Sequence, residues 1–436
     1  MKKTAISTIV IIAALAAMMI STTSCNKNLF DKEITDSIKK ITFHNDKVDP
    51  YHTWSLMNDW VMKVYPNVSG VKRVEILSED PYASREAEVL GSRNVTENKQ
   101  ISVRYSVPTI AQTVYVAAIT EDENGKEQYT VVSAPVSSSS VVDFTSPIAH
   151  SSNTIKKTPE PMTVYYCYCA SYPEPDPNEK GWGFNDLVLK VQKEYVNEMA
   201  IRLHVTLQAI GTTKQIAAAI RLNGVKYADL YDITTTTEKN TFIKDPEAEG
   251  FIIEDKNLKI EGRDGYAVLK LFDDAHAAFR VKTNNNGTVE RWKFNVSHTT
   301  SAGSTEWNPV TVSYNVVFNK AIASEIGFWN LDPFIAYYYN SARWEVHKYN
   351  YKFCESLFSI YDGKERAYYD GFSWALEIPY SQFRYPLSGN GIGSYKDGVL
   401  YGAYQYQGHS FGEWGSNHEK AQDWYLNKYA QSKMVY

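Results

Sequence analysis

Cysteine is scarce in this chain of 436 residues, which contains only Cys25, Cys167, Cys169 and Cys354. Cys25 is assigned to an N-terminal lipid. The other three cysteines are odd in number and lack the regular spacing of a disulfide-rich protein, which excludes a disulfide scaffold. Cys167 and Cys169 share one face if they lie on a strand. Because no second Cys-x-Cys pair or nearby histidine completes a metal site, we expect buried free thiols, with one bridge to Cys354 as the alternative.

Positive charge is also limited. The chain carries 45 Lys and Arg against 50 Asp and Glu, a formal net charge of -5, and it has no basic block. Removal of residues 1–24 takes away Lys2 and Lys3 and no acid, so that -5 becomes -7. A mildly acidic surface of this kind argues against nucleic acid as a partner.

The chain has no hydrophobic run long enough to indicate a membrane span. The N-terminal apolar run from Ala5 to Ile20 is shorter than the roughly 20 residues that a bilayer requires. Two lysines precede it and small polar residues follow it, so residues 1–24 are predicted to be a signal peptide. Ser24-Cys25 resembles a lipoprotein cleavage site, with Cys25 acylated and residues 25–42 as a tether. We therefore expect a lipid-anchored protein of the outer membrane or cell surface, with a simple secretory signal as the alternative.

A helical stripe and an internal repeat are missing as well, whereas the chain has 32 tyrosines and many short alternating runs. In residues 201–208, apolar side chains alternate with Arg202, His204, Thr206 and Gln208, which predicts a strand with one buried and one outward face. Five further strands are predicted in VKRVEIL (71–77), ISVRYSV (101–107), TVYVAAIT (113–120), PVTVSYNVVF (309–318) and LYGAYQYQ (400–407). Short helices are predicted only in SREAEVL (84–90) and HEKAQDWYLNKYA (418–430).

These patterns predict a mainly β protein with two sandwich domains. Residues 43–145 have the size and strand content of an immunoglobulin-like β-sandwich. Residues 146–160 are rich in Ser, Thr and Pro and are interpreted as a linker. Residues 161–436 are interpreted as one larger β-rich domain with few short helices.

GHSFG (408–412) matches the Gly-x-Ser-x-Gly pattern of a hydrolase nucleophile elbow, with Ser410 as the nucleophile. An elbow requires a strand before the serine, a helix after it, and an acid and a histidine further along the chain. The following GEWGSN shows no helix start, and so short a tail does not supply the later strands. We therefore expect a glycine-flanked turn and no catalytic role for Ser410.

Two acidic stretches supply the candidate metal ligands. Asn185 and Asp186 lie in GWGFND (181–186), and Asp273 and Asp274 lie in LFDDAH (271–276). Turn capping by backbone hydrogen bonds is the first interpretation, and structural Ca²⁺ is the alternative, although two side-chain ligands fall short of the six to eight oxygens that calcium takes. A glycosidase pair between Asp186 and either later aspartate is a third interpretation, which the sequence does not constrain.

Aromatic residues supply the candidate ligand-binding residues. Trp182 in GWGFND and Trp344 in ARWEV (342–346) are expected to stack on sugar rings if they are exposed. The alternative is that they fill sandwich cores, because aromatic residues favour strands.

An ordered set of short motifs resembles the LruC-domain lipoproteins of Gram-negative bacteria. The motifs are FNDLVLKV (184–191), LFDDAH, LDPFI (331–335), EVH (345–347), WALEIP (374–379), FRYPL (383–387) and DWYLN (423–427). VDPYHTWSL (48–56), VEILSEDPY (74–82) and AEVL (87–90) resemble the N-terminal domain of the same proteins. The resemblance implies a β-rich, surface or outer-membrane lipoprotein with an LruC-type domain over residues 161–436. The family pattern carries acids where this chain has Gly181 and Gly183, so the calcium ligands it implies are incomplete here.

The resulting expectation is a non-enzymatic cell-envelope lipoprotein that binds a glycan or protein ligand or serves structurally at the surface. A carbohydrate-active enzyme is one alternative. A passive surface assembly subunit is the other.

Overall fold

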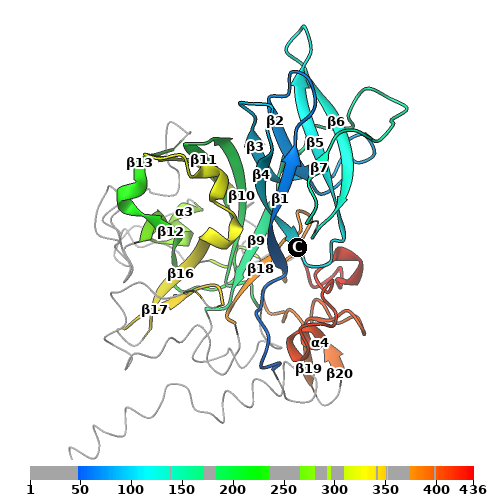
Figure 1. Ribbon diagram of the computed structural model, residues 1–436. Coiled ribbons are helices and arrows are strands. Elements are labelled where there is room, and N and C mark those ends of the chain that lie inside the picture. Colours follow the sequence, from blue (N-terminus) through cyan, green and yellow to red (C-terminus); the bar gives the residue numbers. More distant parts are fainter. Residues whose placement is uncertain are drawn as a thin grey trace, which may run out of the picture.

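The computed structural model describes residues 48–137, 139–170, 183–235, 266–279, 292–295, 309–339, 342–349, 351, 373–396 and 399–436. The described part of the chain is mainly β, as predicted, with few short helices. Figure 1 shows two strand-rich units side by side, with the C-terminal segment beside the first of them. Within the described residues, no helix has the length and apolar content needed to cross a membrane.

The first unit is a sandwich of two sheets. The smaller sheet has the strand order β4-β1-β7, and the larger has the order β6-β5-β2-β3-β8. The face between them is filled by the alternate apolar residues of the strands, such as Val114, Val116 and Ala118 of β5. The strands are β1 (Met57–Tyr65), β2 (Arg73–Leu77), β3 (Glu88–Asn94), β4 (Ile101–Pro108), β5 (Thr113–Glu121), β6 (Glu127–Pro135), β7 (Val142–Asp143) and β8 (Glu160–Pro161).

Residues 146–160, predicted as a linker, lie against the outer face of the larger sheet. Ile148 and Ile155 pack on the apolar cluster that Ala117, Ile119 and other outward residues form there. The backbone N–H of Ile148 donates to the Val131 carbonyl at 2.8 Å. The segment therefore covers apolar surface that a sandwich of this kind otherwise exposes.

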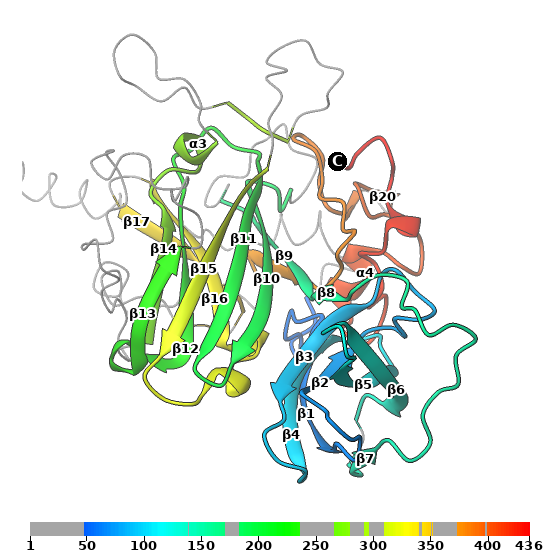
Figure 2. The same ribbon diagram turned by 90° about the horizontal axis from the view of Figure 1, so that it is seen from above.

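The second unit contains a six-stranded sheet, β13-β15-β11-β10-β9-β18, and a four-stranded sheet, β14-β12-β16-β17. Figure 2 shows the strands of this unit next to the first sandwich, with β10 closer to that sandwich than β11 is. Its strands are β9 (Thr163–Tyr168), β10 (Leu187–Asn197), β11 (Ala200–Ile210), β12 (Ala217–Lys226), β13 (Leu230–Thr235), β14 (Tyr266–Phe272), β15 (Val310–Phe318), β16 (Leu331–Tyr339), β17 (Ala342–Val346) and β18 (Ala375–Ile378).

Short elements complete the described chain, including a separate pair of strands near the C-terminus. They are β19 (Ser394–Lys396) and β20 (Val399–Tyr401), the α-helices α3 (Ala275–Ala278) and α4 (Phe411–Ser416), and the 3₁₀ helices η3 (Tyr227–Asp229), η4 (Ala323–Glu325), η5 (Phe328–Asn330) and η8 (Asn427–Tyr429). One continuous apolar cluster runs from the first sandwich through the second unit to the C-terminal segment.

Five of the six predicted strands are confirmed as β2, β4, β5, β11 and β15. The sixth, over residues 400–407, is wrong beyond Tyr401, because Gly402 has a φ of +114°. A Cβ at this position would lie 2.8 Å from Gly393 Cα and 2.9 Å from the Gly391 carbonyl oxygen. The helix predicted over 84–90 is also wrong, since β3 begins at Glu88 and pairs with β2. The helix predicted over 418–430 is reduced to the single 3₁₀ turn η8.

The two described cysteines are buried, and neither forms a disulfide. Cys167 lies on β9, where burial raises the pKa of its thiol. The prediction of buried thiols outside disulfides is confirmed for this pair. Cys354, like Cys25, lies outside the described residues.

Candidate functional site

A cleft of about 560 Å³ lies between the two units. One wall comes from β2, β3 and the segment before β9, and the other from β10 and β11. Most of its side chains are polar because they stand on the outward faces of strands. Arg202 and His204 lie on the outward face of β11, as the alternation of apolar and polar residues in this strand predicts. The lining residues include Arg73, Glu75, Gly91, Asn94, Glu127, Lys193, Glu194, Tyr195, Arg202 and His204.

Arg73 organises the wall that belongs to the first sandwich. Its Nε donates to Glu75 Oε1 at 2.7 Å, and its two Nη atoms contact the carboxylate of Glu127 at 2.5 and 3.0 Å. Burial raises the pKa of Glu75, although Arg73 acts in the opposite direction. The hydrogen bond from Arg73 lowers the pKa of Glu127. One guanidinium group thus holds two carboxylates in place by charge-assisted bonds.

Glu194 on β10 organises the opposite wall. Its Oε2 accepts from Arg202 Nη1 at 3.0 Å and lies 3.4 Å from His204 Nε2. Arg202 and His204 are themselves oriented by β15, through Asn315 Oδ1 at 2.8 Å and Ser313 Oγ at 2.7 Å. The hydrogen bond from His204 lowers the pKa of Glu194.

The charges of the cleft balance. Apart from His204, its lining contains three cations, Arg73, Lys193 and Arg202, and three carboxylates, Glu75, Glu127 and Glu194. Burial lowers the pKa of Lys193 to about 8, against the opposing effect of Asp59. A surface of paired donors and acceptors with no excess charge suits a neutral, hydroxyl-rich ligand, because such a ligand adds no unpaired charge.

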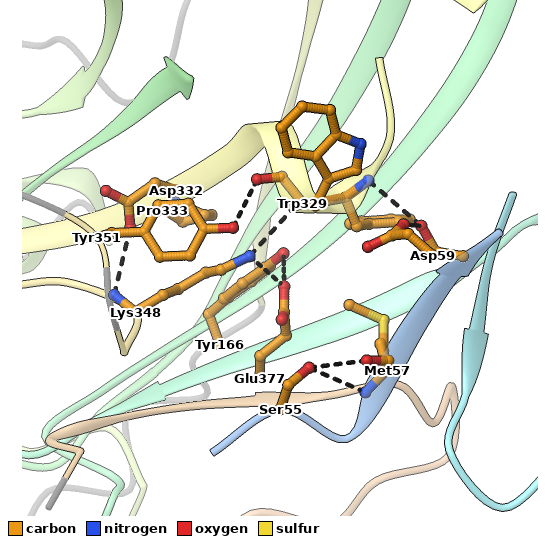
Figure 3. A network of polar contacts seen from close by, with 12 residues as sticks. Ser55, Met57, Asp59, Tyr166, Trp329, Asp332, Pro333, Lys348, Tyr351 and Glu377 are labelled. Atoms are coloured by element: carbon orange, nitrogen blue, oxygen red, sulfur yellow. Dashed lines mark hydrogen bonds and ion pairs between the residues drawn. The ribbon is translucent and has the colours of Figure 1, made fainter. Parts of the chain in front are cut away.

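A second polar group, which we call the buried network, lies in the interior between the units (Figure 3). Its centre is Lys348, whose Nζ lies 2.8 Å from Glu377 Oε1 and donates to the Phe328 carbonyl at 3.2 Å. Tyr166 donates to the same oxygen of Glu377 at 2.8 Å. Lys348 and Glu377 are only 6% and 7% exposed. Burial opposes ionisation, but the charge of Glu377 keeps the pKa of Lys348 above its ordinary value.

The residue before Lys348 extends the buried network. His347 Nδ1 lies 2.7 Å from Asp332 Oδ2, and its Nε2 lies 3.0 Å from Glu345 Oε2. Phe334 stacks on the imidazole at 4.3 Å between ring centroids. Burial alone would lower the pKa of His347, but Asp332 and Glu345 raise it to about 9. Both ring nitrogens therefore carry protons at neutral pH.

The first sandwich contacts this region through β1 and β4. Ser106 donates to Asp59 Oδ1 at 2.5 Å, and the Phe328 N–H lies 3.4 Å from Ser106 Oγ. Ser55 forms an isolated parallel bridge with Glu377. Arg104 lies over the Trp329 ring, 5.6 Å from its centroid. These contacts fix the orientation of one unit relative to the other, and with it the walls of the cleft.

Asn185 and Asp186 are placed in the interior rather than in a groove. The Asn185 amide donates to the Pro386 and Leu387 carbonyls at 3.1 and 3.0 Å. Asp186 Oδ2 accepts from the Ala170 N–H at 2.6 Å. A Cβ at Gly183 would lie 2.4 Å from Asn185 Oδ1, so the space that an acid would need at position 183 is already filled.

Asp273 and Asp274 also have protein partners. Asp274 caps α3 by accepting from the His276 N–H at 2.9 Å, and Asp273 forms an ion pair with Lys270 at 2.7 Å. Among the described residues, an indirect link joins the two candidate pairs: the Gly211 N–H donates to the Asp186 carbonyl, and His276 Nε2 lies 3.0 Å from the carbonyl of the next residue, Thr212.

The four predicted ligands already contact protein groups. Calcium takes six to eight oxygens, whereas an oxygen of Asp186 and one of Asp274 accept backbone N–H groups, and Asp273 faces an ammonium group. Within the described ranges, no group of three or more His, Cys, Asp and Glu is arranged to hold a metal ion. Of the four residues, Asp274 caps a helix, and calcium binding stays a prediction.

The remaining predicted residues are only partly described. Trp344 pairs with Tyr337 in the register of β16 and β17. Trp182 and Cys25 lie outside the described residues, as does the predicted tether.

Ser410 begins a helix, contrary to the prediction that none follows it. It is the N-cap of α4, with its Oγ accepting from the Glu413 N–H at 3.2 Å and donating to Glu413 Oε2 at 2.8 Å. This capping box satisfies free N–H groups of the first turn. Ser410 is fully buried, so the capping box accounts for the serine in GHSFG without a nucleophilic role.

The sequence interpretation missed the residues that line the cleft. The sequence does contain a signal for these residues: Arg73 and Glu75 are two positions apart, as are Arg202 and His204. This spacing places each pair on one face of a strand. What the spacing does not show is that β2 and β11 face each other across a domain boundary.

Three comparisons with known proteins bear on identity. A family model described as "Domain of unknown function (DUF4842)" matches residues 196–425, more than half of the chain. No curated protein was found to be related. Among solved structures, the crystal structure of a putative lipoprotein from Bacteroides ovatus is similar with a TM-score of 0.49 and 14% sequence identity, over 84% of this chain and 99% of that chain.

Proposed function

The chain belongs to the DUF4842 family, and from this premise we propose that it is a lipid-anchored cell-envelope protein that binds a neutral glycan in the cleft between its two units. The resemblance to LruC-domain lipoproteins and the cleavage site before Cys25 support the anchor. We further propose that the anchored protein lies at the outer membrane and faces the cell surface.

The balanced charge of the cleft is the observation that carries the binding proposal. Sugar hydroxyl groups donate to carboxylates and accept from guanidinium groups, so a glycan matches the paired side chains that Arg73 and Glu194 organise. A bound anion would instead face the carboxylates of the cleft, and a bound cation would face its basic side chains, so either ligand would be repelled by groups of like charge. Because the pairs are already formed, little side-chain ordering is required when the ligand binds.

Glycan array binding by the full-length protein in detergent tests the proposal. We expect binding to at least one neutral glycan and an affinity loss of about tenfold in Arg202→Ala, because hydrogen bonds to charged groups contribute about 1.5–3 kcal/mol. Arg85→Ala, at an exposed position outside the cleft, is the matched control and should bind normally. An array without neutral-glycan binding, or a folded Arg202→Ala protein that binds as well as the control, would contradict the proposal.

The anchor has a separate test. Mass spectrometry of the mature N-terminus should find acylated Cys25, and intact cells treated with protease should lose the protein from their surface. An unmodified N-terminus or a cut at another position would disprove the anchor without affecting the cleft.

Glycan cleavage is the second candidate function, and the carboxyl groups of the cleft favour it. Burial raises the pKa of Glu75 while the hydrogen bond from His204 lowers that of Glu194, and glycosidases use carboxyl groups of contrasting pKa as acid and base. Product analysis of the bound glycans decides between the two candidates. Shortened products that disappear with Glu75→Gln would replace binding by hydrolysis.

A further inference from the structure

An exposed group of aromatic rings lies on the C-terminal segment, apart from the cleft. Tyr406 follows β20 and is 54% exposed. Its ring lies 5.3 Å from that of Tyr429 and 6.0 Å from that of His409, measured between centroids. The His409 and Tyr429 rings are stacked at 4.1 Å and 11°. The Tyr406 ring is tilted by 50° to His409 and by 39° to Tyr429, so the three rings form one aromatic group rather than a plane. We call this group, Tyr406, His409 and Tyr429, the aromatic platform.

Asp423 supplies a polar frame for the platform. Its Oδ1 lies 2.7 Å from His409 Nδ1, and its Oδ2 accepts from the Tyr429 hydroxyl at 3.1 Å. The side chains of His409 and Asp423 are 36% and 24% exposed. The carboxylate therefore fixes both rings in place while polar atoms stay within reach of solvent.

The core of this segment is built by a different set of aromatic residues. Tyr404, Trp414, Trp424 and Tyr425 are at most 1% exposed and belong to the continuous apolar cluster. Tyr406 does not belong to that cluster. Tyr406 thus stands outside the core, beside the Asp423 carboxylate and the His409 imidazole.

We propose that Tyr406, His409, Asp423 and Tyr429 bind a neutral pyranose ring. The face of the exposed Tyr406 ring carries partial negative charge and attracts the C–H groups of a sugar face, whereas the Tyr429 ring is stacked on His409 and has Lys428 Nζ over it. Asp423 and His409 stand at the edge of the platform, where they can hydrogen-bond hydroxyl groups. Asp423 disfavours an anion, and Lys428 Nζ, 4.8 Å from the centroid of the Tyr429 ring, disfavours a cation.

This site is independent of the cleft, because none of its residues lines the cleft. If both sites bind parts of one glycan or of neighbouring glycans, the second contact forms at a high effective concentration, and the avidity exceeds either affinity. The failure of one proposal leaves the other intact, since each rests on its own residues.

Saturation-transfer NMR with the methyl pyranosides of glucose, galactose and mannose tests the platform in the full-length protein. We expect saturation of the ring protons of at least one sugar and a fall of at least fivefold in Tyr406→Ala. Tyr406→Phe keeps the ring and should retain the signal, and Asp423→Asn should weaken it. Tyr231→Ala, which removes another tyrosine that is 79% exposed, is the matched control.

Arg202→Ala distinguishes sugar binding at the platform from sugar binding in the cleft. This variant alters the cleft alone, so the saturation-transfer signal from the platform should be unchanged. An equal signal in Tyr406→Ala and Tyr231→Ala, or no saturation of any of the three sugars, would overturn the platform. Loss of the signal in Arg202→Ala but not in Tyr406→Ala would assign the sugar to the cleft instead.

Discussion

Lys348 Nζ lies 2.8 Å from Glu377 Oε1 and joins the end of β17 to β18 inside the second unit, and both side chains are buried. Tyr166 and the Phe328 carbonyl complete the hydrogen bonding of the pair. In the interior, such a pair is satisfied only while both partners are present. The packing of the four-stranded sheet against the six-stranded sheet of the second unit thus depends on a matched pair of charges rather than on apolar packing alone.

Removing one partner of this pair should be strongly destabilising. Lys348→Met leaves the Glu377 carboxylate buried without its ammonium group, and the expected loss of unfolding free energy is about 3–5 kcal/mol. Lys348→Met combined with Glu377→Gln should recover part of that loss, because no unpaired charge remains. Chemical denaturation of the three proteins measures the difference.

Lys320→Met is the control for this prediction. Lys320 forms an ion pair with Asp229 at 2.7 Å but is half exposed, so its loss should cost at most about 1 kcal/mol. Equal effects of Lys348→Met and Lys320→Met would show that the buried pair adds no more stability than an exposed one.

His347 should make the protein less stable at alkaline pH. Its pKa is about 9 in the folded chain against 6.5 for an ordinary histidine, because the Asp332 and Glu345 interactions outweigh burial. A pKa raised by folding means that the protonated form is stabilised in the folded state. The contribution, on the order of 3 kcal/mol, is complete below about pH 6.5 and is lost as the pH rises through about 9.

The unfolding free energy measured between pH 6 and pH 10 checks this prediction. The fall in the native protein should be reduced in His347→Gln, which keeps hydrogen-bonding capacity but does not titrate. A pH dependence that is the same in both proteins would assign the fall to other groups.

The sequence predicted the elements whose signal is local. The alternation of residues 201–208 identified β11 and the outward position of Arg202 and His204 because a strand has a period of two. The pairing of Glu194 with Arg202 follows from the hairpin of β10 and β11, which is also local. The position of β2 opposite these strands is not a local feature, because it depends on the packing of the two units.

The missed helix α4 shows a second limit. Two of its six residues are glycines, which are poor helix formers. The helix forms nevertheless because the capping box satisfies its first turn and because Phe411 and Trp414 are buried in the apolar cluster. The same tertiary contacts decide against the helix predicted over 418–430, where Trp424 and Tyr425 are both buried.

Calcium should not change the stability of the protein through the four predicted ligands. An oxygen of Asp186 and one of Asp274 already accept backbone N–H groups, so an ion would have to displace those hydrogen bonds. Melting temperatures measured in millimolar CaCl₂ and in EDTA should agree within error. A rise with calcium that disappears in Asp186→Asn would show that the loop rearranges around an ion.

Ser410→Ala should reduce stability without affecting glycan binding. The substitution removes the side chain that caps α4 and leaves the Glu413 carboxylate without its hydroxyl donor. Loss of an N-cap serine costs about 1 kcal/mol, which should appear as a lower melting temperature. Ser151→Ala, at an exposed position, is the control and should leave the melting temperature unchanged. Because Ser410 is buried and its hydroxyl is engaged within the helix, no change is expected on the glycan array. If a folded Ser410→Ala protein lost a glycan-cleaving activity, Ser410 would have to be the nucleophile that the GHSFG pattern first indicated.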